Sequence, residues 1–224
     1  MIRYILFDLD NTLYPVSSGM EEALQRRIIG YVMSFLGLSP EEALRVREEG
    51  ITRHGTTLEW LIHEKGFTDI DGYYVAVHPD GEEDELSTDP DLRPFLEGLP
   101  VPRAILTNSP EEHSDRILKK LGIADLFTHV FDMRWNGNRG KPLPSAFYRA
   151  LDVLGTSPAE TLFVDDHPRY VEGYIALGGR GLLLDEQDAH RDFPHPRIRR
   201  LKEIAGFLGT SFLETSFLLP DYED

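Results

Sequence analysis

Ile2-Arg3-Tyr4-Ile5-Leu6-Phe7, followed directly by Asp8-Leu9-Asp10-Asn11-Thr12, gives the strongest indication of the fold. The first six residues are mostly aliphatic, aromatic or β-branched, which predicts a short strand buried on both faces of a parallel sheet. Open α/β sheets bind their ligands outside the carboxyl ends of their strands. Asp8 and Asp10 are therefore candidate functional residues, although two aspartates can also simply end a strand in an acidic protein.

Four further apolar runs predict strands, and segments of helical period separate most of them. Pro110–Leu121 and Pro144–Leu154 have the clearest helical pattern, with a glycine directly after each. This alternation predicts an α/β fold with a Rossmann-like, doubly wound parallel sheet. The four predicted strands are Arg103–Thr107, His129–Phe131, Thr161–Val164 and Gly181–Leu184.

The connection between the first two strands is far longer than a crossover helix needs, so we expect it to be a domain of its own. Amphipathic patterns within it predict three helices, and Ser39 is placed to cap the second of them. We therefore predict a core domain of residues 1–15 and 92–208, an all-helical insertion of residues 16–91, and an unassigned tail of residues 209–224. The three predicted helices are Met20–Leu36, Pro40–Gly50 and Thr57–Lys65.

Two linkers, Tyr14–Gly19 and Pro79–Pro94, would join this insertion to the core at one place and form a hinge. Within the second linker, the acidic run Glu82–Glu85 is most simply a solvated segment, although it could also bind a cation.

Composition narrows the classes of function. The formal net charge is −16 and there is no cysteine, so thiolate catalysis and cysteine-ligated zinc are excluded. The acidity disfavours nucleic-acid polymers and membrane surfaces as main partners. The apolar run at the start is interrupted by Asp8 and Asp10, so no signal peptide or membrane span is expected there, and a cytoplasmic location is predicted.

Polar side chains follow the later strands as well. Thr107-Asn108-Ser109 leads into a helix N-terminus, where free N–H groups favour a phosphate, although Ser109 could be an ordinary N-cap. Lys141 follows the third strand and could reach the same edge of the sheet. Asp165 and Asp166 end the fourth strand, and two adjacent buried carboxylates repel unless a cation such as Mg²⁺ neutralises them.

These four strand ends together resemble the ordered motifs of the haloacid dehalogenase superfamily of phosphohydrolases. The motifs are present as Asp8-Leu9-Asp10-Asn11-Thr12-Leu13, Leu106-Thr107-Asn108, Lys141-Pro142 and Phe163-Val164-Asp165-Asp166. The resemblance covers the whole predicted core. Dehalogenating members lack the second aspartate that Asp10 supplies, so the resemblance implies a phosphatase.

The resemblance also implies roles for individual residues. Asp8 would be the nucleophile that carries an aspartyl-phosphate, and Asp10 the general acid and base. Mg²⁺ would be held by Asp8, the backbone carbonyl of Asp10 and Asp166, with Asp165 behind them or acting through a water. The residues that would hold phosphoryl oxygens are Thr107, the backbone N–H of Asn108, and Lys141.

One position departs from the family pattern. Many relatives have Asn or Asp four residues after the last-motif aspartate, and this chain has Tyr170 there. That departure raises the alternative of a catalytically idle binding or regulatory protein with the same fold.

Finer features resemble the pyrimidine 5′-nucleotidase-like branch, whose small helical cap covers the site. Tyr14-Pro15, His54-Gly55-Thr56-Thr57-Leu58 and Asp71-Gly72-Tyr73-Tyr74 carry this resemblance, together with Lys141–Phe147. Aromatic residues could offer a face to a base, with hydroxyl and imidazole groups at its edge; alternatively, they form the lobe's own core. The candidate recognition residues are Tyr14, His54, Thr56, Thr57, Tyr73 and Tyr74, with Trp60 as a further aromatic.

The predicted function is thus a Mg²⁺-dependent phosphomonoesterase for a small phosphorylated metabolite, with a pyrimidine nucleoside 5′-monophosphate as the first candidate substrate. A sugar phosphate or another small ester is the alternative, and transfer to a second hydroxyl is a further one. The eight histidines show no metal-ligand spacing. His167 is expected either to start a helix or to contact the phosphate.

Overall fold

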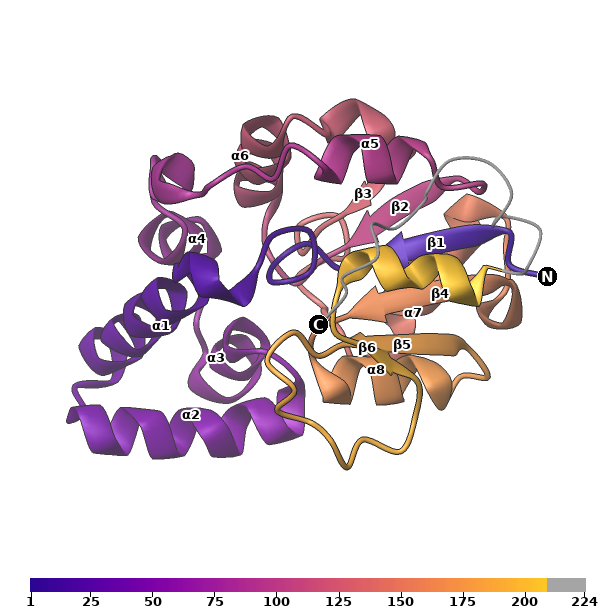
Figure 1. Cartoon of the computed structure of the whole chain (residues 1–224). Helices are drawn as coiled ribbons and strands as arrows, with labels where there is room; N and C mark the ends of the chain where they lie inside the picture. Colours follow the sequence, from indigo (N-terminus) through magenta and orange to yellow (C-terminus); the bar gives the residue numbers. More distant parts are fainter. Residues whose placement is uncertain (209–224) are drawn as a thin grey trace.

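The computed structural model describes residues 1–208, so the predicted tail lies outside the described residues. Six parallel strands form one sheet in the order β3-β2-β1-β4-β5-β6 (Figure 1). The predicted doubly wound α/β fold is confirmed. The strands are β1 (Tyr4–Phe7), β2 (Arg103–Leu106), β3 (Val130–Phe131), β4 (Thr161–Asp165), β5 (Arg180–Leu184) and β6 (Arg197–Ile198).

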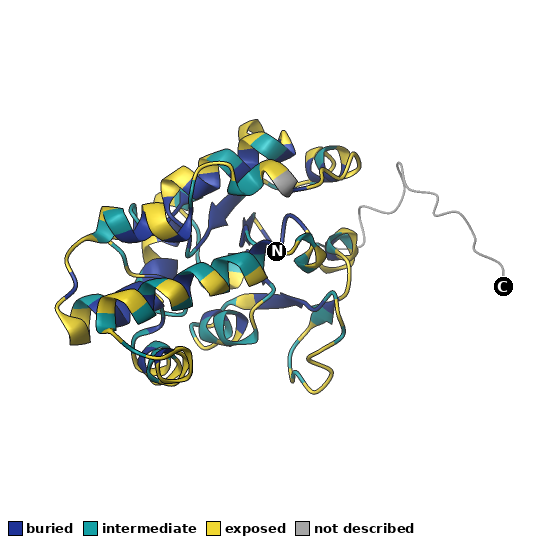
Figure 2. Cartoon of the chain, turned by 90° about the vertical axis from the view of Figure 1, so that its left-hand side faces the viewer, coloured by how far each residue is buried: buried dark blue, intermediate teal, exposed yellow. Residues whose placement is uncertain are grey.

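Helices cover both faces of the sheet, as burial on both sides of each strand requires. Ile5 and Phe7 of β1 pack on one face with α5 and α6, while Leu6 packs on the other face with α7 and α8. Figure 2 shows the strands as dark blue, buried segments between helices that are buried on one side only. These helices are α5 (Leu92–Glu97), α6 (Glu111–Leu121), α7 (Pro144–Leu154) and α8 (Pro168–Ile175).

The insertion between β1 and β2 is helical and has a separate apolar core, built around Trp60, Leu61 and Tyr73. It stands to one side of the sheet, beyond the carboxyl ends of the strands (Figure 1). The capping box at Ser39 confirms the predicted N-cap. The domain boundaries at residues 16 and 91 stay a prediction. The helices are α1 (Met20–Leu36), α2 (Pro40–His54), α3 (Thr57–Lys65) and α4 (Ile70–Val77).

The end of α2 corrects a prediction, because the helix continues past Gly50 to His54. A Cβ at Gly50 would lie 2.4 Å from ring carbons of Trp60. This glycine therefore permits close packing of α2 on α3 and does not end the helix.

The acidic run in the second linker is more ordered and more buried than the sequence suggested. Residues Glu82–Glu85 form a 3-10 turn, and the Glu82 side chain is only 3% exposed. It forms ion pairs with Arg27 of α1 and Arg116 of α6, so this part of the linker is not a freely solvated segment.

Among the described residues, no helix is both long and apolar enough to span a bilayer.

Candidate active site

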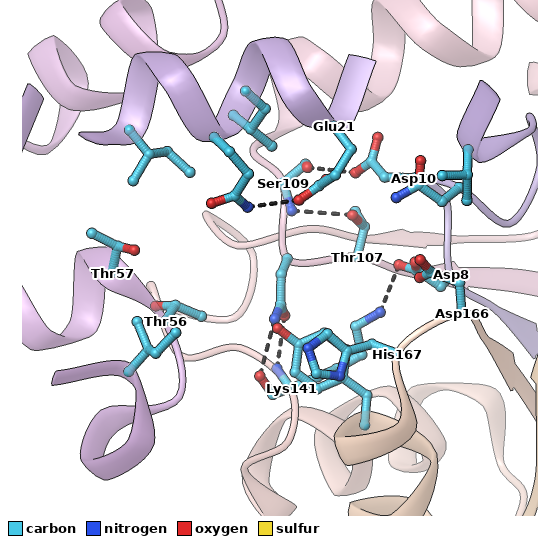
Figure 3. A pocket seen from close by; sticks show the side chains of 18 of the residues that line it. Asp8, Asp10, Glu21, Thr56, Thr57, Thr107, Ser109, Lys141, Asp166 and His167 are labelled. Atoms are coloured by element: carbon cyan, nitrogen blue, oxygen red, sulfur yellow. Dashed lines mark hydrogen bonds and ion pairs between the residues drawn. The ribbon is translucent and has the colours of Figure 1, made fainter. Parts of the chain in front are cut away.

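A cavity of about 500 Å³ lies where the strand ends face the insertion. Most of the predicted site residues line it, and Thr56 and Thr57 face Asp8 and Asp166 across it (Figure 3). The predicted residues at the cavity wall are Asp8, Asp10, Thr56, Thr57, Tyr73, Tyr74, Thr107, Asn108, Lys141, Asp166, His167 and Tyr170. Asp165, Tyr14, His54 and Trp60 are not part of the wall.

A tight turn after β1 brings both aspartates to the cavity. Asp8 continues the sheet, since its N–H donates to the Val164 carbonyl at 2.8 Å. Asn11 then adopts φ of 56°, a left-handed conformation that asparagine tolerates better than most residues. The turn lets Asp10 reach the same cavity as Asp8.

Lys141 is held at the centre of the strand edge. Its side chain is 1% exposed, and Nζ donates to Asp8 Oδ1 and Asp165 Oδ2, each at 2.6 Å. Burial alone lowers the pKa of Lys141, but the charges of Asp165 and Asp8 outweigh it and raise the pKa above its ordinary value. Lys141 is therefore a fixed cation beside Asp8.

The carboxylates outnumber this cation. Oxygens of Asp8, Asp165 and Asp166 lie within 4.8 Å of one another, a grouping that could hold a metal ion. Burial, with Asp165 as the next cause, raises the pKa of Asp166 to about 8. Burial also raises the pKa of Asp8 despite Lys141. The buried oxygen Asn11 Oδ1 has no hydrogen-bond partner. An excess of buried negative charge, together with oxygen atoms that are free to act as metal ligands, suits a hard divalent cation.

The loop after β2 holds the backbone of Lys141 in place. The Asn108 side chain accepts from the Lys141 N–H at 2.7 Å and donates to its carbonyl at 3.0 Å. Thr107 Oγ1 accepts from the Ser109 N–H at 3.1 Å. The Asn108 side chain therefore serves the lysine, and its backbone N–H remains the group predicted to hold a phosphoryl oxygen.

Ser109 is not an N-cap. The N-cap of α6 is Pro110, and Ser109 Oγ instead donates to Asp10 Oδ2 at 2.7 Å (Figure 3). Tyr14 likewise donates to Asp10 Oδ1, at 2.6 Å, so its hydroxyl contacts the second aspartate and its ring is not part of the cavity wall. Both side chains orient Asp10.

His113 is the third partner of Asp10, and the sequence analysis missed it. Nε2 lies 2.7 Å from Asp10 Oδ1, while Nδ1 lies 2.5 Å from Glu82 Oε1. Burial lowers the pKa of His113, but the charge of Asp10 and these hydrogen bonds raise it to about 9. Burial raises the pKa of Asp10, and His113 outweighs it, so this pKa lies well below its ordinary value.

His113 lies beside His78, which the spacing of the histidines did not indicate. The two residues are distant in sequence, yet their Nδ1 atoms lie 3.1 Å apart, and with Glu82 they form a group that could hold a metal ion. The signal that could have found His113 is its place in the first turn of the helix after Thr107-Asn108, which faces the same sheet edge.

The Tyr170 ring lies next to the ammonium group of Lys141. Lys141 Nζ lies 5.2 Å from the centre of its ring, and burial raises the pKa of Tyr170 to about 12. His167 stacks on Tyr170 and is the N-cap of α8, where Nδ1 accepts from the Arg169 N–H at 3.3 Å. His167 therefore starts a helix and also lines the cavity.

Fewer of the predicted insertion residues line the cavity than the sequence suggested. His54 contacts Glu64 at 2.8 Å, and Trp60 is buried in the insertion's own core, so neither is part of the cavity wall. Thr57 Oγ1 accepts from Arg47 Nε at 2.8 Å, and Arg47 lines the cavity.

A sequence model of the haloacid dehalogenase-like hydrolase family matches residues 2–178. The chain belongs to this family. Haloacid dehalogenase-like hydrolases of known structure share its fold: a phosphatase of this family from Thermococcus onnurineus superposes with a TM-score of 0.65 at 23% identity, covering 95% of this chain and 100% of that one.

Two curated relatives of this haloacid dehalogenase-like chain are more similar in sequence. Phosphate metabolism protein 8 of Saccharomyces cerevisiae is 28% identical over 190 residues, which are 79% of this chain and 59% of the yeast protein. A phosphoglycolate phosphatase of Pectobacterium atrosepticum is 26% identical over 191 residues, covering 81% of this chain and 79% of that protein.

Proposed function

We propose that this protein is a Mg²⁺-dependent phosphomonoesterase that works through a phosphorylated Asp8. The observation that carries the proposal is the convergence of Asp8, Asp10, Lys141 and Asp166 on one cavity. Relatives named as phosphatases support a phosphoester as substrate.

In the first displacement, a carboxylate oxygen of Asp8 attacks phosphorus, and the bond to the leaving alcohol breaks. Asp10 gives a proton to that alcohol. The negative charge of a bound phosphate raises the pKa of Asp10 by like-charge repulsion, which favours the protonated form needed here. The Lys141 ammonium, the Thr107 hydroxyl and the Asn108 N–H would hold the phosphoryl oxygens.

In the second displacement, water attacks the aspartyl-phosphate and Asp10 accepts the proton. The low pKa of Asp10 in the free protein means that its carboxylate is deprotonated there, which is the form that a base needs. Asp8, Asp166 and the backbone carbonyl of Asp10 would hold Mg²⁺, while Asp165 stays bound to Lys141 at 2.6 Å. The bound ion would neutralise charge on the transferring phosphoryl group.

The substrate that we propose is a small phosphorylated metabolite, and a pyrimidine nucleoside 5′-monophosphate is the first candidate. Thr56, Thr57, Tyr73 and Tyr74 line the cavity on the insertion side, which supports a leaving group that contacts the insertion. Sugar phosphates remain the alternative. We propose that the insertion acts as a cap, that its bounds are residues 16–91 and that the protein works in the cytoplasm.

Phosphate release from p-nitrophenyl phosphate, measured with EDTA and with Mg²⁺, tests the activity. We expect turnover only with Mg²⁺, and none with Asp8→Asn at unchanged circular dichroism. Activity that persists in Asp8→Asn would contradict the covalent mechanism, while absence of any Mg²⁺-dependent turnover would favour the idle binding protein. A panel of pyrimidine nucleotides and sugar phosphates then tests the substrate, and a preference for sugars would overturn the nucleotide proposal.

A further inference from the structure

His113 occupies a position that the proposed mechanism does not use. The residue is 2% exposed, in the first turns of α6, and its two ring nitrogens connect Asp10 to Glu82. This connection runs from the proposed acid and base to the segment that returns from the insertion to the core.

The partners of Asp10 divide unequally between its two oxygens. Oδ1 receives the Tyr14 hydroxyl at 2.6 Å and His113 Nε2 at 2.7 Å, whereas Oδ2 receives only the Ser109 hydroxyl at 2.7 Å. A carboxylate oxygen accepts about two hydrogen bonds. Among the described residues, Oδ2 therefore keeps the open position, and Oδ2 is the atom placed to exchange a proton with a ligand in the cavity.

Glu82 fixes the orientation of the His113 ring. Its carboxylate is 3% exposed and lies between two guanidinium groups: Arg27 of α1 at 2.6 Å and Arg116 of α6 at 3.2 Å. His78, at the end of α4, contacts the same oxygen at 3.2 Å. Because Glu82 holds Nδ1, the His113 ring presents Nε2 to Asp10.

The alternative for this cluster is a metal ion bound by His78, Glu82 and His113. The ligand atoms already contact one another, and two guanidinium groups balance the charge of Glu82. The hydrogen-bonded network therefore satisfies these groups without a cation.

We propose that His113, held by Glu82, is a positioning residue that occupies Asp10 Oδ1 and so directs Oδ2 to the leaving group. This inference rests on the proposed function, because it concerns the aspartate that delivers the proton. It predicts that loss of His113 impairs proton delivery more than it impairs attack by Asp8.

The leaving group separates these two effects. p-Nitrophenyl phosphate expels a stable phenolate that needs little protonation, whereas glycerol 2-phosphate expels an alcohol that needs a proton. We would compare kcat and KM for both esters in His113→Leu, His113→Gln and Glu82→Gln. The matched controls are His129→Gln, at an exposed histidine, and Glu83→Gln, which pairs with Arg116 and has no histidine contact.

For His113→Leu we expect kcat on glycerol 2-phosphate to fall about 100-fold, the size of a typical acid–base contribution, and kcat on p-nitrophenyl phosphate to fall less than about fivefold. His113→Gln keeps an N–H donor, so its kcat on glycerol 2-phosphate should fall less. Glu82→Gln should also lose more activity on glycerol 2-phosphate than on p-nitrophenyl phosphate. Both controls should retain wild-type rates. Thermal unfolding shows whether each variant folds. If His113→Leu does not fold, the comparison is made with His113→Gln and Glu82→Gln.

Equal losses on the two esters would assign His113 a merely structural role, and unchanged rates would remove it from the site; either result overturns the inference. For every variant, only the part of the turnover that disappears in Asp8→Asn is compared. Turnover that survives Asp8→Asn contradicts the proposed function, whereas a loss without leaving-group selectivity contradicts the role of His113 alone.

Discussion

Replacement of Lys141 by methionine tests the electrostatics of the site. The ammonium is 1% exposed and forms two 2.6 Å ion pairs, with Asp8 and with the fully buried Asp165. Removing one partner of a buried ion pair costs about 3–5 kcal/mol, because the other charge stays buried without compensation. For a chain of this size, such a loss lowers the melting temperature by about 6–20 °C.

The effect should depend on pH. Burial raises the pKa of Asp8 in the folded protein, and removal of Lys141 raises it further. A carboxyl whose folded pKa exceeds its unfolded value of about 3.9 contributes stability at low pH and loses it as the pH rises through the folded pKa. The deficit of Lys141→Met should therefore be largest at alkaline pH and shrink towards pH 5.

Urea unfolding followed by circular dichroism, in EDTA so that no divalent cation compensates, measures this deficit. The double variant Lys141→Met/Asp165→Asn is the matched control, since it removes one of the two uncompensated charges and should recover part of the loss. A deficit below about 1 kcal/mol at pH 8, or one that grows as the pH falls, would show that Lys141 does not compensate the buried carboxylates.

Three further predictions concern packing, pH and the metal. Gly50→Ala should cost about 1–3 kcal/mol in calorimetry because its Cβ meets Trp60, whereas the control Gly30→Ala, which has open space, should stabilise α1; similar effects would contradict the packing argument. Because the pKa of His113 is raised to about 9, its contribution of about 3 kcal/mol is complete below pH 6.5 and lost as the pH rises through 9. His113→Gln should flatten that part of the pH–stability curve, and an unchanged curve would exclude the contribution. Asp166→Asn should weaken Mg²⁺ binding more than about tenfold by titration calorimetry, and unchanged affinity would remove it from the metal site.

The sequence was sufficient for the framework of the fold. Short apolar runs predicted five of the strands, and β6 was missed because two residues, Arg197 and Ile198, carry no periodicity. The end of α2 was placed too early, because helix propensity treats Gly50 as a break, whereas tertiary packing on Trp60 determines its role.

The motifs predicted which residues lie at the strand ends, and most of these residues line one cavity. The local partners were harder to predict. Nothing in the spacing of Tyr14, Ser109 and His113 shows that all three reach Asp10, because the three positions meet only once the sheet is assembled. The burial of Glu82 was missed for the same reason: its compensating arginines come from two different helices.

Tyr170 shows how a departure from a motif can be accommodated. The family pattern has Asn or Asp here, to orient the lysine or the residues around the metal, and in this chain an aromatic face lies 5.2 Å from the Lys141 ammonium. Cation–π attraction of this kind adds to the two hydrogen bonds that the ammonium donates to Asp8 and Asp165. The departure is therefore compatible with a fixed lysine.

The proposed mechanism requires that Asp8 becomes phosphorylated during turnover. Acid quenching of the Asp10→Asn variant with Mg²⁺ and p-nitrophenyl phosphate, followed by peptide mass spectrometry, tests it most directly, because loss of the base slows release of the phosphoryl group. We expect a phosphoryl group on Asp8, and none in the Asp8→Asn/Asp10→Asn double variant. Phosphorylation of another residue, or nitrophenol release with no phosphorylated peptide in rapidly quenched samples, would contradict it.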